Sequence, residues 1–158
     1  MSTYNMILSS NESTVVAEYE PQVKRSDSYQ SEAALEQAFI KMLVEQGYEY
    51  VTIHSEDALI DNLRMQLERL NQYSFTDKEW DSFFKHKIAN HNDGIVEKTR
   101  KIQEDHVQNL TREDGTTMNI SLIDKKNIHN NRLQVMNQYE ENGGKHDTRY
   151  DVTILVNG

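Results

Sequence analysis

Residues 132–158 read RLQVMNQYEENGGKHDTRYDVTILVNG and predict two β-strands joined by a polar loop. The first strand covers residues 132–139, and the second, which has the strongest strand pattern in the chain, covers residues 149–156. The loop between them contains Gly143 and Gly144, which favour a turn. We expect the helical patterns that precede these strands to pack on the faces of the sheet to which they belong.

Asp151 interrupts the apolar pattern of the second strand. Alternation places Asp151 on one face with Thr153 and Leu155, and it places Tyr150, Val152, Ile154 and Val156 on the other. Because both faces are largely apolar, we expect a strand buried on both sides, in which a carboxylate requires a partner, a metal ion or a shifted pKa. The residues alone leave two interpretations: an ion pair with Arg149 or Arg132, or a metal site.

The last two residues, Asn157 and Gly158, follow the apolar run directly. Asn-Gly after a strand is a strong signal for a two-residue hairpin turn. We therefore expect the natural protein to continue into a further strand, which would leave residues 149–156 with an unpaired edge here. The alternative is a chance glycine at the end of a complete protein.

Helical patterns dominate the first two thirds of the chain. They cover residues 31–46, 55–71, 76 to about 92, and 95–105. Ser31 can cap the first helix, which Gly47 ends, and the third opens with a capping box from Thr76 to Glu79.

Strand patterns occupy the remainder. Residues 107–112 and 116–124 flank the turn Glu113-Asp114-Gly115 and predict a β-hairpin. An N-terminal arm, residues 1–28, contains a β-prone stretch at residues 14–19. The order of elements predicts one α/β domain with a central mixed or antiparallel sheet and helices on its faces.

Two acidic residues on the first helix are further candidates for a site. Leu35, Phe39 and Leu43 define the buried direction of this helix, and at about 100° per residue Glu32 falls inside that sector, with Glu36 at its margin. A carboxylate in the first turn also interacts favourably with the helix dipole, which is a sufficient reason for Glu32. Both interpretations stay open at this point.

Composition narrows the function classes. The 158 residues include no cysteine, 36% are hydrophobic and 27% are charged, which is typical of a globular domain without disulfides. No apolar run is long enough to span a bilayer and no secretion signal is present, so we expect a cytoplasmic protein without membrane contact. The histidines lack zinc-site spacing, and the phosphate-loop, dinucleotide and serine-hydrolase motifs are absent.

The net charge of −9 argues against a self-sufficient DNA-binding module. Such modules neutralise phosphates with Lys and Arg and are usually basic. An acidic balance is compatible with a metal-dependent nuclease site, which needs carboxylates, if another domain or subunit holds the DNA.

The order of elements resembles a known family. The segments SEAALEQAFIKML, REDGTTMNISLID, NNRLQVMNQY and RYDVTILVNG are similar to the N-terminal domain of the restriction (R, HsdR) subunit of type I restriction-modification enzymes. The resemblance covers residues 29–158, with a helical part at about 31–105 and a sheet part at about 106–158. It implies a restriction-endonuclease-like PD-(D/E)xK nuclease fold.

The resemblance also implies roles for particular residues. Asp151 matches the family's strand aspartate, Glu32 is the better match for a metal-binding glutamate on the first helix, and Glu36 is the second choice. The family's Glu-x-Lys, which follows across the hairpin turn, is absent, so we expect a truncated and inactive fragment. In the intact family Mg2+ supports DNA cleavage, absent motor domains use ATP, and the partners are DNA and the modification and specificity subunits.

Two other functions remain compatible with the sequence. One is a different PD-(D/E)xK nuclease, such as a Holliday-junction resolvase or a repair nuclease. The other is a non-catalytic interaction domain that uses residues 55–105 as a docking surface. Residues that follow position 158 would distinguish these functions from the restriction subunit. Helicase motifs there would support the restriction subunit, and the lack of Glu-x-Lys would support the interaction domain.

Overall fold

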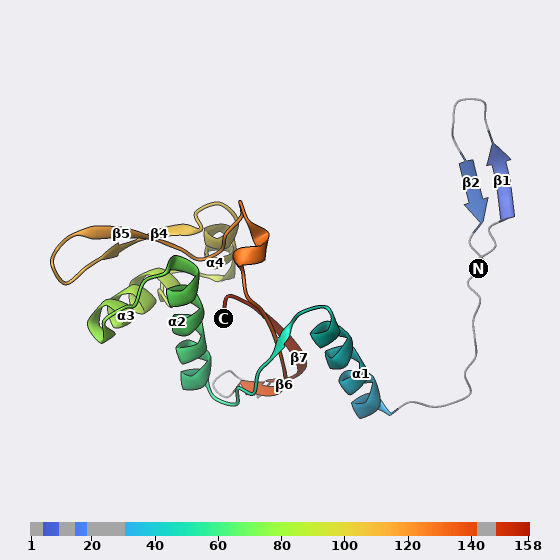
Figure 1. Cartoon of the computed structure of the whole chain (residues 1–158), viewed down its shortest axis with the longest axis horizontal. Helices are drawn as coiled ribbons and strands as arrows, with labels where there is room; N and C mark the ends of the chain where they lie inside the picture. Colours follow the sequence, from blue (N-terminus) through green and yellow to red (C-terminus); the bar gives the residue numbers. More distant parts are fainter. Residues whose placement is uncertain (1–4, 10–14, 19–30, 142–147) are drawn as a thin grey trace. The chain divides into compact units, whose positions relative to one another are not determined.

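A computed structural model describes residues 5–9, 15–18, 31–141 and 148–158 (Figure 1). The chain divides into two units, Met1–Ser31 and Glu32–Gly158. In the first unit, strands β1 (Asn5–Ser9) and β2 (Val15–Glu18) pair antiparallel. Strand β2 confirms the β-prone stretch expected there, whereas β1 was not predicted.

The helices of the second unit lie close to where the sequence predicts them. They are α1 (Glu32–Glu45), α2 (Glu56–Asn71), α3 (Asp77–Phe83) and α4 (Ile95–Gln103), with a π-helix, η1 (Phe84–Ile88), and a 3-10 turn, η2 (Ile128–Asn130). The predicted third helix is thus correct in position but changes from α- to π-type at Phe84. Within the described residues, no helix combines the length and the apolar character needed to cross a membrane.

The helix ends follow from local hydrogen bonding. The Ser55 hydroxyl accepts a bond from the Ala58 N–H, and Thr76 and Glu79 form the reciprocal capping box that the sequence predicts. After α1, the Tyr48 N–H donates to the Leu43 carbonyl while Gly47 takes a φ of +96°. A left-handed residue at this point is where glycine is favoured, and it turns the chain from α1 toward the sheet.

Two separate sheets replace the single central sheet that we expected for this unit. Strands β3 (Glu49–Tyr50), β6 (Leu133–Glu141) and β7 (Thr148–Val156) form one sheet in the order β3-β6-β7, in which β3 is parallel and β7 antiparallel to β6. Strands β4 (Val107–Thr111) and β5 (Thr117–Ser121) form a hairpin of their own. The α/β class is confirmed, but the prediction of one central sheet is wrong.

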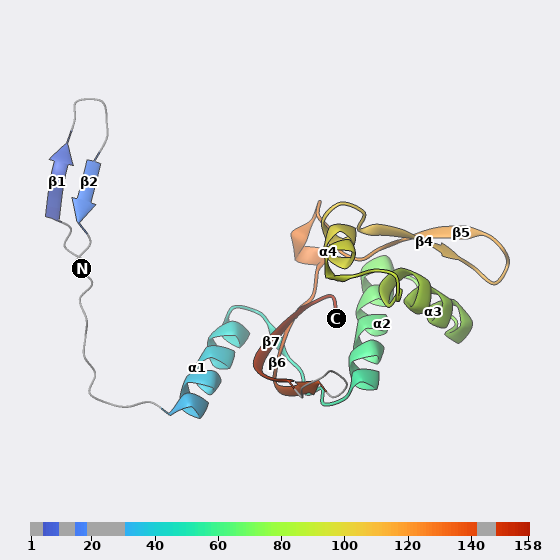
Figure 2. The ribbon, with the colours of Figure 1, turned by 180° about the vertical axis from the view of Figure 1, so that it is seen from behind.

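The α2 helix explains why the hairpin does not join the other sheet. The Asn71 side chain accepts a hydrogen bond from the Ser121 N–H (2.8 Å) and donates one to the Ser121 carbonyl (3.0 Å). The backbone N–H and carbonyl of Ser121 are therefore hydrogen-bonded to α2 and not to another strand. Figures 1 and 2 show the hairpin lying along α2 and α3, away from β6 and β7.

The hydrophobic core lies between α2, α3 and the β4–β5 hairpin. Its buried members are Leu67, Phe75, Trp80, Phe83, Leu110, Ile120 and Leu122. Glu79 is buried beside them, and its carboxylate accepts hydrogen bonds from the Thr76 N–H, the Tyr73 hydroxyl and the Glu113 N–H. These bonds, that from Thr76 most of all, hold the pKa of Glu79 below its usual range and fasten α3 to the hairpin turn.

Strand β7 is an edge strand, and the prediction that it is buried on both sides is wrong. Asp151 is exposed, and Ile154 and Val156 are 45% and 47% exposed. The face that carries Ile154 and Val156 is therefore not fully covered. In addition, β7 has β6 along one edge and no strand along the other within the described residues. The expected unpaired edge is therefore present.

Asn157 fastens the end of β7 to the neighbouring segments. Its buried side chain accepts a hydrogen bond from the Arg132 N–H (2.7 Å) and donates to the Asn131 Oδ1 (2.8 Å) and the Leu122 carbonyl (3.2 Å). Asn157 and Gly158 have φ values of +60° and +86°, the pattern of the central residues in the predicted turn type. A Cβ on Gly158 would lie 2.5 Å from the Leu63 Cα, so only glycine fits against α2 here.

Replacing Asn157 by alanine should therefore destabilise the second unit by about 2–3 kcal/mol, because buried partners lose their hydrogen bonds and alanine disfavours positive φ. Urea denaturation followed by circular dichroism measures this. The exposed Asn119 on β5 is the matched control, and Asn119→Ala should change the free energy of unfolding by less than about 0.5 kcal/mol. Equal effects of the two substitutions would contradict the role of Asn157.

Candidate functional site

One hollow contains all three acidic residues that the sequence nominates. It has a volume of about 290 Å³ and is lined by Glu32, Ala33 and Glu36 of α1, Gln138 of β6 and Asp151 of β7. We call it the acidic hollow. Helix α1 contacts β6 and β7 in the fold, which brings an early helix and the last strand of the chain to one place.

The three carboxylates differ in their surroundings. Glu32 and Asp151 are exposed, and Glu36 is half-buried. The expectation that Glu32 points in the buried direction of α1 is wrong, because Leu35 and Phe39 are themselves 54% and 41% exposed and only Leu43 of that stripe is buried. Contact between α1 and the sheet instead encloses the Glu36 side of the helix.

Side-chain amides of β6 hold the Glu36 carboxylate. The Asn137 Nδ2 donates to Oε1 at 2.6 Å, and the Gln138 Nε2 donates to Oε2 at 3.0 Å and to Oε1 at 3.2 Å. The Tyr50 hydroxyl of β3 donates to the Asn137 Oδ1 at 2.7 Å. Sequence reasoning missed all three residues. Strand alternation gave no sign that neighbouring Asn137 and Gln138 could reach one carboxylate.

Asp151 does not form the ion pair with Arg132 that was one interpretation of the sequence. The Arg132 guanidinium binds Glu49 instead, with 2.8 Å between Nε and Oε2. That hydrogen bond, followed by one from Gln134, lowers the pKa of Glu49 below its usual value. The Arg149 side chain lies outside the described residues, and no described cation pairs with Asp151.

The acidic hollow offers a metal ion only oxygen atoms as ligands. Carboxylates and a side-chain amide are the ligands that hard divalent cations prefer. Across the part of the chain that the structure describes, however, no three Asp, Glu or His residues come close enough together to hold a metal ion. A cation at this place would therefore bind one or two carboxylates and complete its coordination with water or with a substrate.

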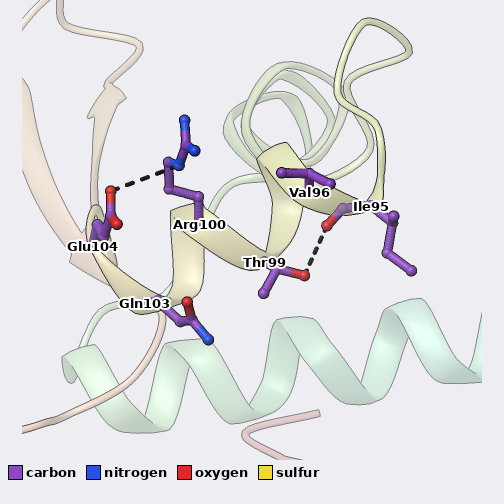
Figure 3. A pocket seen from close by; sticks show the side chains of 6 residues that line it. All are labelled: Ile95, Val96, Thr99, Arg100, Gln103 and Glu104. Carbon is purple, nitrogen blue, oxygen red and sulfur yellow. Dashed lines mark hydrogen bonds and ion pairs between the residues drawn. The ribbon is translucent and has the colours of Figure 1, made fainter.

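Other hollows lack converging chemistry. The hollow of about 300 Å³ shown in Figure 3 is lined by five residues of α4 and by Glu104, which directly follows this helix. There the Thr99 hydroxyl donates to the Ile95 carbonyl, and the Arg100 Nε lies 3.8 Å from the Glu104 Oε2. These polar groups therefore interact with residues four positions away along the chain. A smaller hollow of about 170 Å³ between η1 and β4 includes His86 and Lys87 but no carboxylate. The acidic hollow is the candidate site.

Comparison with known proteins places the chain in a family. The family described as "Type I restriction enzyme R protein N terminus" matches residues 29–158. The chain belongs to this family. The resemblance stated from the sequence is thereby confirmed, and the matched residues include α1 and β7, the elements that carry the acids of the hollow.

Curated relatives of this family extend well beyond the chain. The type I restriction enzyme EcoprrI endonuclease subunit of Escherichia coli is 45% identical over 153 residues, which are 96% of this chain and 49% of that protein. The SsaAORF53P endonuclease subunit of Staphylococcus saprophyticus is 36% identical over 135 residues, covering 82% of this chain and 14% of that protein. The chain thus spans half or less of the length of these two relatives.

The anchoring of Glu36 leads to a prediction about stability. Glu36→Ala should lower the free energy of unfolding by about 1–2 kcal/mol, because the Asn137 and Gln138 amides lose a charged acceptor. Glu32→Ala, four residues earlier on the same helix, should change it by less than about 0.5 kcal/mol, because Glu32 is exposed. Urea denaturation of both variants measures the difference, and a larger effect at Glu32 would contradict this description of the site.

Proposed function

We propose that the acidic hollow is one side of a divalent-metal site for phosphodiester hydrolysis in DNA. The observation that carries the proposal is that Asp151 and the α1 acids, which are far apart in sequence, line a single hollow. Membership of the type I restriction family and the naming of its relatives as endonuclease subunits support the reaction class. The PD-(D/E)xK architecture is part of this proposal.

The donor set fits Mg2+. This cation commonly binds through one or two carboxylates together with water and substrate phosphate oxygens, so it does not need a complete cage of protein ligands. Asp151 and Glu36 would supply the carboxylates, and DNA would supply the phosphate. When bound, Mg2+ polarises a phosphate and lowers the pKa of a water ligand.

The structure changes the order of preference on α1. Glu32 is the better positional match in sequence, but Glu36 is half-buried and bonded by two amides, whereas Glu32 is exposed. A carboxylate already fixed in place loses less conformational entropy when it binds a ligand. We therefore propose Asp151 and Glu36 as the metal-binding pair, with Glu32 beside them.

The residues that line the hollow do not include every group that the family pattern implies for catalysis. Among the described residues no lysine lines the hollow, and the sequence contains no Glu-x-Lys after Asp151. A lysine in this family pattern would stabilise charge on the transition state or assist the attacking water. We infer that residues 1–158 alone do not cleave DNA, and that ATP-driven translocation and contacts with the modification and specificity subunits belong to other parts of the protein.

Metal binding tests the proposal directly on the 158-residue chain. Isothermal titration with Mn2+, a substitute for Mg2+, should show binding that Asp151→Asn weakens at least tenfold, because one carboxylate loses its charge. Asp105→Asn, an exposed acid between α4 and β4, is the matched control and should leave the affinity unchanged. Equal binding by wild type and Asp151→Asn would remove Asp151 from the site.

The same preparations should leave supercoiled plasmid intact in Mg2+. Nicking by the wild type that Asp151→Asn abolishes would support the hollow as a nuclease site, but it would overturn the inference that residues 1–158 are inactive alone. Nicking that persists in Asp151→Asn would assign the activity to other residues.

A further inference from the structure

Gln138 has a backbone conformation that is unusual for its place. It lies inside β6, yet its φ is +57°, in the left-handed region that residues with a Cβ avoid. Only two other described non-glycine residues share this sign, and both lie at the end of an element: Gln72 after α2 and Asn157 after β7. A strained residue in mid-strand persists only where its surroundings require it, and such residues concentrate at functional sites.

The strained backbone has a visible consequence for side-chain direction. Consecutive strand residues normally point to opposite faces of a sheet. Asn137 and Gln138 are consecutive, yet both amides donate to the Glu36 carboxylate, at 2.6 Å and 3.0 Å. The left-handed turn at Gln138 breaks the alternation, so that two adjacent amides meet one acid.

The break in alternation occurs next to Asp151. In the β6–β7 pairing, Asn137 faces Val152 and Tyr139 faces Tyr150, so Gln138 and Asp151 occupy the intervening position. Both of these residues line the acidic hollow. The deviation in β6 therefore lies where the acid from α1 and the acid from β7 approach the same space.

Tyr50 orients the first of the two amides. Its hydroxyl donates to the Asn137 Oδ1 at 2.7 Å, which leaves the Nδ2 of that amide directed at Glu36. An amide that already accepts a bond on its oxygen cannot rotate to present that oxygen to the carboxylate without losing the bond. Tyr50, Asn137 and Gln138 together form a clamp on Glu36, which we call the amide clamp.

We propose that Gln138 is a positioning residue, whose left-handed backbone holds the Glu36 carboxylate toward Asp151 so that both acids serve one divalent cation. The inference rests on the proposed function of the hollow as a metal site. Residues that orient metal ligands by hydrogen bonds commonly affect metal affinity by ten- to a hundredfold. The strain at Gln138 would then be retained for binding and not for stability.

The chain offers a matched pair of substitutions to test this. Gln72 is also a glutamine with positive φ (+51°), but it lies after α2 and is exposed. Glycine relieves left-handed strain, so Gln72→Gly should raise the thermal midpoint by about 2–4 °C. Gln138→Gly relieves the same strain but also removes two hydrogen bonds to Glu36, so it should keep the midpoint near that of the wild type while weakening Mn2+ binding about tenfold. Gln72→Gly should leave Mn2+ binding unchanged.

The outcomes separate the two proposals. Loss of stability together with loss of binding in Gln138→Gly, or unchanged Mn2+ affinity in that variant, would overturn the positioning role. If Asp151→Asn weakens Mn2+ binding but Gln138→Gly does not, the proposed metal site is supported and only the positioning role of Gln138 is refuted. If the wild type binds no Mn2+, both proposals are refuted.

A second variant tests the amide clamp without changing the backbone at Gln138. Tyr50→Phe removes one hydroxyl and should weaken Mn2+ binding about threefold, since the Asn137 amide is freed while Gln138 remains. Tyr48→Phe, two residues earlier, is its control and should have no effect. Equal Mn2+ affinities in Tyr50→Phe, Tyr48→Phe and wild type would contradict the clamp.

Discussion

The antiparallel pairing of β6 with β7 determines where the groups of the acidic hollow can lie. Its register runs from Leu133 opposite Val156 to Glu141 opposite Thr148. A shift by one residue would move every side chain of β7 to the opposite face, and Asp151 would leave the hollow. Asn157 opposes such a shift, because its side chain joins the end of β7 to the Arg132 and Leu122 backbones.

The contacts that stabilise the rest of the unit lie outside the hollow. The aromatic core of Phe75, Trp80 and Phe83 packs under the β4–β5 hairpin, and buried amides of Asn62 and Gln134 join α2 to β6 at 2.9 Å. The hollow itself is polar and open, with exposed Asp151 on an edge strand. Stability therefore comes from one part of the fold, and the strain and polar groups that could bind a ligand are found in another.

The charge of the chain bears on the proposal that a cation lies between the acidic hollow and DNA. The chain has a net charge of −9, and the lining of the hollow contains three acids and no described base. A phosphate would be repelled from such a surface unless a divalent cation lay between them. This agrees with the proposal that binding of the DNA duplex depends on other parts of the protein.

Local signals allowed much of the fold to be predicted. Ser55, the Thr76–Glu79 capping box and Gly47 define helix ends through bonds within a few residues, so the sequence was sufficient there. Strand β3 has only Glu49 and Tyr50 and exists through its pairing with β6, which no local pattern reveals. The separation of the hairpin from the other sheet depends on the hydrogen bonds between Asn71 and Ser121, which are far apart in sequence.

The site was only partly predictable for a similar reason. Asp151 stands out in sequence as a charge in an apolar strand, and helical periodicity together with the family resemblance indicated the α1 acids. The preference for Glu36 over Glu32 depends on amides from β6, and the left-handed conformation of Gln138 contradicts the strand pattern around it. Such a conflict between local preference and the fold is where functional residues are expected.

The most direct test of the central claim is paramagnetic broadening of the amide resonances of the 15N-labelled chain by substoichiometric Mn2+. The acidic hollow predicts that the amides of residues 32–36, Gln138 and Asp151 broaden first, and that excess Mg2+ restores them. Sharp signals at these residues, with broadening at other acidic positions on the surface, would contradict the claim.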